Sequence, residues 1–559
     1  MLFFSPGSLY LAGMRRLVCL MVSLLFAWWA WAQDEEVLRA ARFLSGASSD
    51  EEVDDYWVSQ LEARQGRRIR INAAHIRADG ILTEYQIASL ADYRSSAGDI
   101  LSWEELALVD GFSAELVAVL RPFLSLASDR LPGVADTVRV RASALVRGTL
   151  TSIGGKARVS GSWWRAGGAW RGKDGTFYGE AHYRGHTLLV GDFNARYGQG
   201  LAFWSGFSMS SLSTADAFIR RTPGISPVWS YSSELVHRGA SYTYAGTHWQ
   251  ATVFGGFDGL LGGHGVWQGR HGQVGSTVSY TFGKPGSLTA AVDTRWNWRG
   301  WDAAGEVAWK SGGFAGLAAF RGPVGPVKMA FQGRVVPSRF SGKKYGEYAL
   351  AAGAEYKSEQ RTALAGRSGF GSSVPRHQTS LTADAAFLPI PSVAPSRFQL
   401  RVYAGWQWQV ASAWALDVRF TERYRNYERP RHAFRVDGKF GIGPWSAVSR
   451  LEVVQCEKVG ILNYWEGGYK DERTWSAYFR LTGFLIDQWN DRIYVYERDA
   501  PGNFSVPAYS GRGGAVSLVG SWKHRFRWIT LKAYLRGSWM VRVGRPPTPG
   551  LSLQLHCDL

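Results

Sequence analysis

Beyond residue 131 the sequence alternates with a period of two residues, and this pattern constrains the fold more than any other feature. In "LTAAVDTRWNW", residues 288–298, one set of alternate positions holds Leu, Ala, Val, Thr, Trp and Trp, whereas the other holds Ala, Asp, Arg and Asn. "FQLRVYAGWQW", residues 398–408, repeats the arrangement. Successive side chains of a strand point to opposite faces. The pattern therefore predicts strands with one apolar face that ends in aromatic residues and one polar face.

A closed antiparallel barrel in a lipid bilayer gives each of these faces a solvent. Such barrels use strands of about 9–11 residues that are apolar outside and polar inside, with aromatic girdles at the two interfaces. A soluble sandwich also alternates, but its apolar face rarely ends in paired Trp or Tyr. We count about 22 strands between Thr137 and Leu559 and expect an even number from about 16 to 24.

The polar face of these strands is predicted to line the barrel interior. In "GDFNARYGQGLAFW", residues 191–204, we expect Phe193 and Tyr197 to face hydrocarbon. Interior charges either pair with one another and fill the barrel, or bias an open lumen toward anions. The residues predicted to face the lumen are Asp192, Asn194, Arg196, Asp293, Arg295, Arg401, Asp417 and Arg419.

Two connections are longer than the others, residues 205–233 and 357–376. Counting strands from a periplasmic N-terminus places both of them at the periplasmic end, where barrel turns are usually short. Either the count is wrong by one strand, or these segments fold inward as constrictions.

The first residues predict export. Arg15 and Arg16 form a basic segment, residues 17–29 are apolar, and an Ala-Trp-Ala cleavage site ends at Ala32. This arrangement is typical of a signal peptide, residues 1–32, and the short apolar run disfavours an uncleaved anchor. No later stretch of 18 or more apolar residues occurs.

No enzyme motif is found in the sequence. G-x-S-x-G, H-E-x-x-H, the P-loop and paired C-x-x-C are all missing, so we expect no catalytic residues, no metal ligands and no cofactor. His182 and His186 read as polar residues at a strand end. Cys456 and Cys557 either pair or remain lone thiols.

The first part of the mature chain has a different character. Residues 33–130 contain 18 Asp and Glu against 10 Arg and no Lys, a formal charge of −8, while residues 131–559 carry +24. Apolar residues three and four apart in residues 52–126 predict a small all-α domain. Opposite charges on neighbouring domains favour docking of one against the other.

This domain resembles the helix-hairpin-helix domain of the ComEA type. The matching residues are Asn72-Ala73, Gly80, Tyr93-Arg94, Gly98, Glu104-Glu105-Leu106, Gly111 and Leu120-Arg121-Pro122-Phe123. In that family, Pro-Gly-hydrophobic-Gly hairpins hold a DNA phosphate. The two hairpins here depart from that pattern, because each keeps one Gly and gains a carboxylate. The candidate DNA contacts are Asp79, Gly80, Ile81 and Leu82, then Asp110, Gly111, Phe112 and Ser113, and the basic cluster Arg67, Arg68 and Arg70.

The whole chain resembles Gram-negative outer-membrane proteins in which a helix-hairpin-helix domain precedes a large barrel. The segments that carry this resemblance are "LLVGDFNARYGQGLAFWSGF" and "ELVHRGASYTYAGTHWQATVFGGFDG". The resemblance implies an α+β multidomain chain with a signal peptide at 1–32, a periplasmic helical domain at 33–130 and an outer-membrane β-barrel at 131–559. Outer-membrane lipid and the barrel-assembly machinery are then expected partners.

Two functions are open at this point. In the first, the barrel is a channel whose periplasmic domain binds DNA or passes it on. In the second, the protein has a structural or transport role, and its acidic domain plugs the barrel or docks a periplasmic protein. No enzymatic activity is expected of either.

Overall fold

The computed structural model describes most of the chain. The described residues are 35–64, 68–73, 76, 80–128, 140–205, 212–231, 234–269, 271–283, 286–343, 345–358, 377–389, 396–411, 413–471 and 474–559. The predicted signal peptide and the candidate DNA contacts Arg67 and Asp79 lie outside this range.

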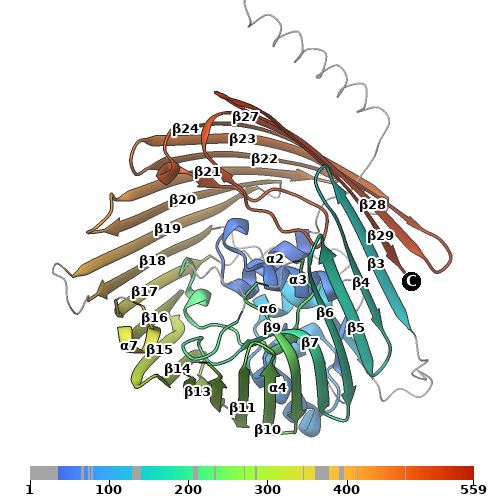
Figure 1. Cartoon of the computed structure of the whole chain (residues 1–559), viewed down its shortest axis with the longest axis vertical. Coiled ribbons are helices and arrows are strands. Elements are labelled where there is room, and N and C mark those ends of the chain that lie inside the picture. The colour runs from blue at the N-terminus through green and yellow to red at the C-terminus, as the bar shows by residue number, and fades with distance from the viewer. Residues whose placement is uncertain are drawn as a thin grey trace, which may run out of the picture.

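Antiparallel strands form one closed barrel around a helical region (Figure 1). The first twelve wall strands are β3 (Arg141–Thr149), β4 (Ile153–Ser160), β5 (Trp164–Arg171), β6 (Asp174–Tyr183), β7 (His186–Arg196), β9 (His237–Ala245), β10 (Trp249–Gly256), β11 (Leu260–Gly269), β12 (Gly272–Thr281), β13 (Ser287–Trp298), β14 (Trp301–Lys310) and β15 (Gly313–Val324). The other twelve are β16 (Val327–Val336), β17 (Glu347–Lys357), β18 (His377–Leu388), β19 (Arg397–Ala411), β20 (Trp414–Arg425), β21 (Arg431–Ile442), β22 (Trp445–Gln455), β23 (Val459–Lys470), β24 (Trp475–Ile486), β27 (Gly511–Arg525), β28 (Thr530–Arg542) and β29 (Arg545–Asp558). The last strand pairs with the first, β29 with β3, and this pairing closes the barrel.

The described wall has 24 strands, two more than the count of 22 and at the upper limit of the predicted range. Weak alternation explains the undercount. In β5, for example, Gly167 and Gly168 occupy adjacent positions and carry no side chain to mark a face. Turns of two residues, such as Arg299-Gly300, also leave little sequence between strands.

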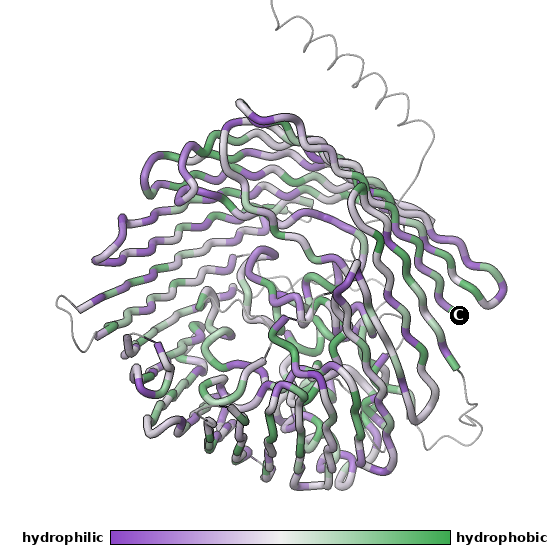
Figure 2. Tube along the Cα trace, viewed as in Figure 1, coloured by the Kyte–Doolittle hydropathy of each residue, from purple (hydrophilic) through white to green (hydrophobic). Residues whose placement is uncertain are grey.

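Hydrophobic and hydrophilic residues alternate along the wall strands (Figure 2). On β13, Val292, Trp296 and Trp298 are 56%, 46% and 63% exposed, whereas Ala291 and Asp293 are buried. Leaving such side chains in water is unfavourable, so this outer surface requires a hydrocarbon environment. The fold is therefore that of a transmembrane β-barrel, as the alternation predicts.

The helical region precedes β3 and lies inside the ring of strands (Figure 1). It contains α2 (Glu35–Ser45), η1 (Asp50–Glu52), α3 (Asp55–Arg64), β1 (Ile69–Asn72), α4 (Glu84–Ala97), α5 (Trp103–Leu108), α6 (Ala114–Leu120), η2 (Arg121–Phe123) and β2 (Leu124–Ser128). These elements share one apolar core that includes Leu61, Ile71, Leu90, Leu106 and Leu120. We call residues 35–128 the plug.

The prediction of an all-α domain is wrong in one respect. β1 and β2 pair in parallel as a small sheet, with Ile69 beside Leu124. Three residues, Ile69, Ile71 and Leu124, are buried, because alternate positions of these short strands cover the helical core. Asn72 joins the sheet to the rest of the plug, since its side-chain amide bonds both backbone groups of Ile100.

Two long connections fold into the barrel from the same end. The first joins β7 to β9, residues 197–236, and includes η3 (Ala215–Phe218) and β8 (Gly224–Pro227). The second joins β24 to β27, residues 487–510, and includes η4 (Trp489–Asp491), β25 (Ile493–Tyr494) and β26 (Ala508–Tyr509). We call these the first and second inward loops, and the barrel end that carries them the loop end. The opposite end, where β3 begins and β29 finishes, is the terminal end.

The expectation that both long connections lie at the periplasmic end is wrong. Nine strands, β9–β17, separate the β7–β9 connection from the β17–β18 connection, and an odd number of antiparallel strands puts them at opposite ends. The undercounted strands account for this error. A short helix, α7 (Ser338–Ser341), lies in the connection between β16 and β17. None of the described helices has the length and hydropathy needed to cross a membrane.

Candidate functional site

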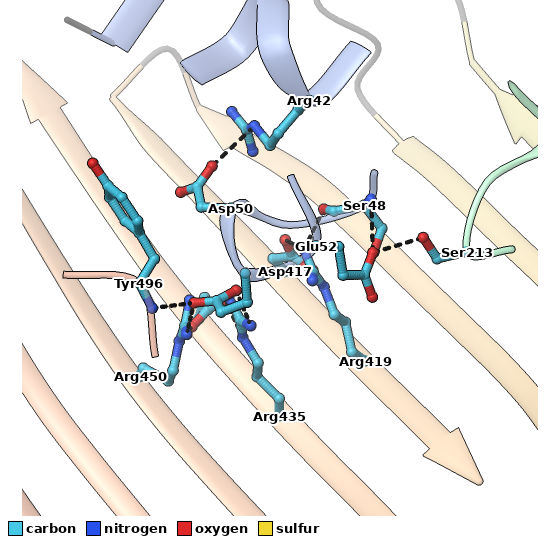
Figure 3. A network of polar contacts seen from close by, with 12 residues as sticks. Arg42, Ser48, Asp50, Glu52, Ser213, Asp417, Arg419, Arg435, Arg450 and Tyr496 are labelled. Atoms are coloured by element: carbon cyan, nitrogen blue, oxygen red, sulfur yellow. Dashed lines mark hydrogen bonds and ion pairs between the residues drawn. The ribbon is translucent and has the colours of Figure 1, made fainter. Parts of the chain in front are cut away.

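A buried carboxylate at the tip of the plug joins it to the barrel wall (Figure 3). Glu51 in η1 is 2.8 Å from a guanidinium nitrogen of Arg435 and 2.5 Å from one of Arg450. The backbone N–H of Tyr496, in the second inward loop, donates to the same carboxylate at 3.1 Å. One side chain therefore connects the plug, the strands β21 and β22, and an inward loop.

The charge on Glu51 is fixed by these neighbours. Burial raises the pKa of its carboxyl group, but the charges of Arg435 and Arg419 outweigh this effect and lower the pKa to about 2. Glu51 is thus ionised at neutral pH. Because removal of one partner would leave an uncompensated buried charge, this contact resists opening of the plug.

The neighbouring residues of the plug make further contacts with the wall. Arg419 of β20 donates to the carbonyl of Ser48 at 2.5 Å and pairs with Asp417 at 3.0 Å (Figure 3). Ser213, in the first inward loop, donates to Glu52 at 2.7 Å. The segment between α2 and α3 is therefore held from the wall and from a loop at once.

The last residue of β7 holds α3 in place. Arg196 is almost fully buried, pairs with Asp54 at 3.0 Å and places its guanidinium 4.4 Å from the centre of the Tyr56 ring. An ionic and a cation–π contact therefore act together at this point.

The second inward loop continues this attachment. Asp499 accepts two bonds from Arg147 of β3, at 2.8 and 2.9 Å, and one from Arg536 of β28. The N–H of Gly502 donates to Glu62 of α3 at 2.7 Å. Tyr496 itself belongs to the apolar core of the plug. This loop thus holds the plug on one side and is held to the wall on the other.

The first hairpin of the plug packs against the first inward loop. Gly80 has φ +77°, and a β-carbon there would lie 2.2 Å from the Pro223 β-carbon. Arg221 donates to the carbonyl of Ile81 at 3.1 Å, and both Ile81 and Leu82 are buried. The first inward loop thus covers this hairpin at Gly80 and Ile81.

The second hairpin is more open. Asp110 and Ser113 are exposed and Gly111, with φ +81°, and Phe112 are half-buried. Ser113 uses its hydroxyl to cap α6, since it accepts from the N–H of Leu116. Of the described members of the basic cluster, Arg68 is exposed and Arg70 half-buried. A carboxylate at an exposed hairpin opposes phosphate binding, so this geometry does not favour a DNA site.

The N-terminus of α4 contacts the wall through a second acid. Gln250 of β10 donates to Glu84 at 2.5 Å. Burial and the nearby charge of Asp293 raise the pKa of Glu84 to about 7, although the Gln250 bond acts in the opposite direction. This contact is therefore pH-dependent near neutrality, in contrast to the contact of Glu51.

The predicted lumen residues fall into four groups. Arg196, Asp417 and Arg419 contact the plug or its anchors, as described above. Asp293 is buried near Glu84, and Arg295 is half-buried. Arg401 is exposed. Asp192 and Asn194 are buried in the wall, where Arg238 binds Asp192 at 2.8 Å and Ser205 donates to Asn194 at 3.4 Å.

The expectation that Phe193 and Tyr197 face hydrocarbon is wrong. Both are buried and pack with Phe254 and Leu260 in one cluster. The backbone bends at Gly191, which has φ +114°, and residues 193–196 then pair with β8 of the first inward loop. Protein therefore covers both faces of this segment.

Several anchors were not identified from the sequence. Inside the barrel, carboxylates are bound by Arg435, Arg450, Arg147 and Arg536. The residues predicted from the sequence to face the lumen did not include these four. The alternation in "RVDGKF", which places Arg435, Asp437 and Lys439 on one face, contains the signal for the first. Which arginine meets which acid depends on the docked plug and is not encoded locally.

Two cavities lie beside the plug at the terminal end. The larger, of about 950 Å³, lies between the plug and β17–β21 and is lined by Glu115, Lys357 and Gln407, among others. Lys357 pairs with Glu115 of α6 at 2.7 Å across it. The second, of about 680 Å³, lies further along the wall and is lined by Gln409, Lys439 and Tyr469, among others. The plug thus fills the lumen unevenly and leaves space along one side.

Cys456 and Cys557 are both free thiols and half-buried. In the described part of the chain, no group of three or more His, Cys, Asp or Glu side chains is arranged to hold a metal ion.

Solved structures of large outer-membrane proteins share the barrel fold. A chain of the E. coli P pilus tip assembly intermediate PapC-PapD-PapK-PapG is 10% identical with a TM-score of 0.39, over 77% of this chain and 62% of that one. The FrpB iron transporter from Neisseria meningitidis is 6% identical with a TM-score of 0.40, over 76% and 81%. The copper transporter OprC is 9% identical with a TM-score of 0.36, over 77% and 81%.

These similarities are too low to assign a function, so the fold assignment rests on the strand pairing of this chain itself. The chain matches no protein-family model and no curated protein.

Proposed function

We propose that the protein is an outer-membrane transport channel that its own N-terminal helical domain keeps closed. The observation that carries this proposal is the position of the acidic plug inside a basic barrel, attached through Glu51 to Arg435 and Arg450 and through Asp54 to Arg196. A purely structural barrel has no need of an internal domain bound by buried ion pairs. A channel that opens on demand does need one.

The terminal end is the periplasmic end in this proposal. Ten of the connections at that end are short, as is usual for periplasmic turns, whereas both inward loops enter from the other end. The plug would then be reached from the periplasm and the two loops from outside. Outer-membrane lipid surrounds the wall, and the barrel-assembly machinery inserts it.

A periplasmic protein is the partner we propose for opening. Leu101 and Leu108, which flank the ends of α5, are 82% and 83% exposed, and Glu104 of the same helix lines the cavity at the terminal end. Exposed apolar residues beside carboxylates fit a protein partner better than DNA. The candidate role in DNA binding or uptake receives no such support from the two hairpins.

Single-channel recording of the full chain in planar bilayers tests the proposal. The wild-type protein should conduct rarely, and Glu51→Gln combined with Asp54→Asn should raise the open probability severalfold, because both buried anchors are lost. Asp92→Asn combined with Asp174→Asn is the matched control, since it removes two exposed carboxylates. A double anchor variant that conducts no more than the control would contradict the plug mechanism. Retarded migration of duplex DNA by the wild-type chain at physiological salt would restore the DNA role.

A further inference from the structure

Three arginines stand next to one another across the wall near the loop end. Arg401 of β19 is directly opposite Arg423 of β20, and Arg423 is directly opposite Arg431 of β21. Like charges in directly opposite positions of a sheet repel and destabilise the pairing. The row therefore requires counter-charges, either from the protein or from a ligand.

The three side chains face the interior. Arg419 lies four residues before Arg423 and contacts the plug, and Arg435 lies four residues after Arg431 and also contacts the plug. Positions four apart on a strand share a face. Arg401 shares the face of Arg423 because the two are paired in register.

The protein neutralises a second row of arginines on the same face. Four residues closer to the terminal end, Arg419 and Arg435 are also directly opposite, and there Asp417, Asp437 and the plug's Glu51 bind them. The charge of that row is compensated by carboxylates within 3.0 Å.

The carboxylates near the Arg401 row are engaged elsewhere. Glu428 binds Arg425 at 2.8 Å and lies 3.9 Å from Arg423. Asp384, which is opposite Arg401 on β18, is held by Arg334 at 2.9 Å. Arg431 has partners in the protein, because Glu452 and Asp491 attract it and it donates to the carbonyl of Arg492 at 2.8 Å. In the described part of the chain, the shortage of carboxylates therefore falls on Arg401 and Arg423.

The row is also open to solvent and leads toward the cavity. Arg401 is exposed, and the Arg423 side chain is 35% exposed. On the same face of β19, the positions after Arg401 are Tyr403, Gly405, Gln407 and Gln409, all of which line the cavity of about 950 Å³. Tyr403 is buried and separates the row from the cavity. An anion held at the row would therefore lie on the loop-end side of Tyr403, with the cavity on the other side.

We propose that Arg401, Arg423 and Arg431 form a capture site for multivalent oxyanions, solutes that carry several phosphate or carboxylate groups, at the loop-end mouth of the barrel. Guanidinium groups bind such groups in bidentate fashion, and a row of three spaced along neighbouring strands matches several of them at once. The identification of such anions as the transported cargo rests on the proposed channel function. The identification of the row as a binding site does not depend on that function.

Equilibrium dialysis of the detergent-solubilised full chain tests the site, with inorganic pyrophosphate and citrate as probes at low and at physiological salt. We expect saturable binding of at least one probe that weakens with salt. Arg401→Gln combined with Arg423→Gln should weaken it at least about tenfold, because charge-assisted hydrogen bonds to the anion are lost. The control, Arg527→Gln combined with Arg545→Gln, removes the same charge from exposed positions outside the row and should bind like the wild type.

Two results would overturn the site: binding of neither probe, or equal affinity of the row variant and the control variant. Failure of the channel function is distinguishable from this, because dialysis requires no conduction. If the channel of the anchor variants stays closed in bilayers while pyrophosphate or citrate still binds through the row, the binding site is supported and the transport role is contradicted.

Discussion

At the scale of single residues, two acids of the plug respond to pH in opposite ways. Glu51 is surrounded by guanidinium groups and stays ionised, whereas Glu84 is near Asp293 and accepts a hydrogen bond from the side-chain amide of Gln250. The same residue type therefore acts as a permanent anchor at one contact and as a titrating contact at the other.

Replacement of Glu51 by Gln should weaken the docking of the plug by about 3 kcal/mol, since removal of one partner from a buried ion pair leaves the other charges uncompensated. Hydrogen exchange of η1 and α3 in detergent measures this change. Asp92→Asn, on the exposed face of α4, should leave the exchange rates unaltered. Exchange in Glu51→Gln as slow as in the wild type would show that the arginines do not hold the plug.

Docking at α4 should weaken as pH rises. The pKa of Glu84 is raised from 4.5 to about 7 in the docked state, so the docked state binds the proton more tightly. Its contribution is fully present below pH 4.5 and is lost as pH rises through 7, a change of about 3 kcal/mol. The protease sensitivity of α4 between pH 5 and 8 measures this, and Glu84→Gln should flatten the profile. A wild-type profile that is already flat would contradict the assignment.

At the scale of elements, the inward loops decide how the plug is held. The first inward loop packs on the hairpin at Gly80 through Pro223 and Arg221, and the second inserts Tyr496 into the plug core. Both loops enter from the end opposite the chain termini, so the plug is supported from the far side of the barrel. Events at the loop end can therefore reach the plug directly.

Gly80→Ala should loosen the first hairpin more than Gly98→Ala does. Both glycines have positive φ, +77° and +93°, so both substitutions incur backbone strain, of about 1–3 kcal/mol. A β-carbon at Gly80 would also meet Pro223 at 2.2 Å, whereas one at Gly98 would meet nothing within 4 Å. Hydrogen exchange in α4 of the two variants isolates the contact with the loop. Equal exchange in both would mean that this contact contributes nothing.

Much of the wall could be predicted from the sequence, and much of the site could not. The alternation in β13 and β19 identified two-faced strands because it depends on local geometry alone. The inward bend of β7 depends on Gly191 and on pairing with β8, about 30 residues later, so Phe193 and Tyr197 were placed in the wrong environment. The anchors at Glu51 require contacts between residues almost 400 positions apart, which no local pattern reports.

At the scale of the whole molecule, the charges of the two parts are complementary. The plug segment is acidic and the barrel carries a large positive excess, and the buried pairs at Glu51 and Asp54 are where the two meet. The plug is thus a counter-charge for the lumen as well as a physical obstruction.

Deletion of residues 35–128 should therefore leave a pore that is open and strongly anion-selective, because Arg196 loses Asp54 while Arg435 and Arg450 lose Glu51. The reversal potential across a KCl gradient measures the selectivity. Removal of two of these positive charges with Arg435→Gln and Arg450→Gln in the deleted protein should reduce the preference for chloride. A cation-selective pore would contradict the inferred electrostatics of the lumen.

The seam between β29 and β3 sets an order of events for assembly. The wall becomes continuous only when Ser552–Asp558 of the final strand align with residues 143–149 of the initial one. Because residues 35–128 are tethered immediately upstream of that initial strand, the helices sit beside the gap until it shuts. Closure of this seam must therefore either enclose a helical body already in position or leave the terminal mouth wide enough to admit one afterwards.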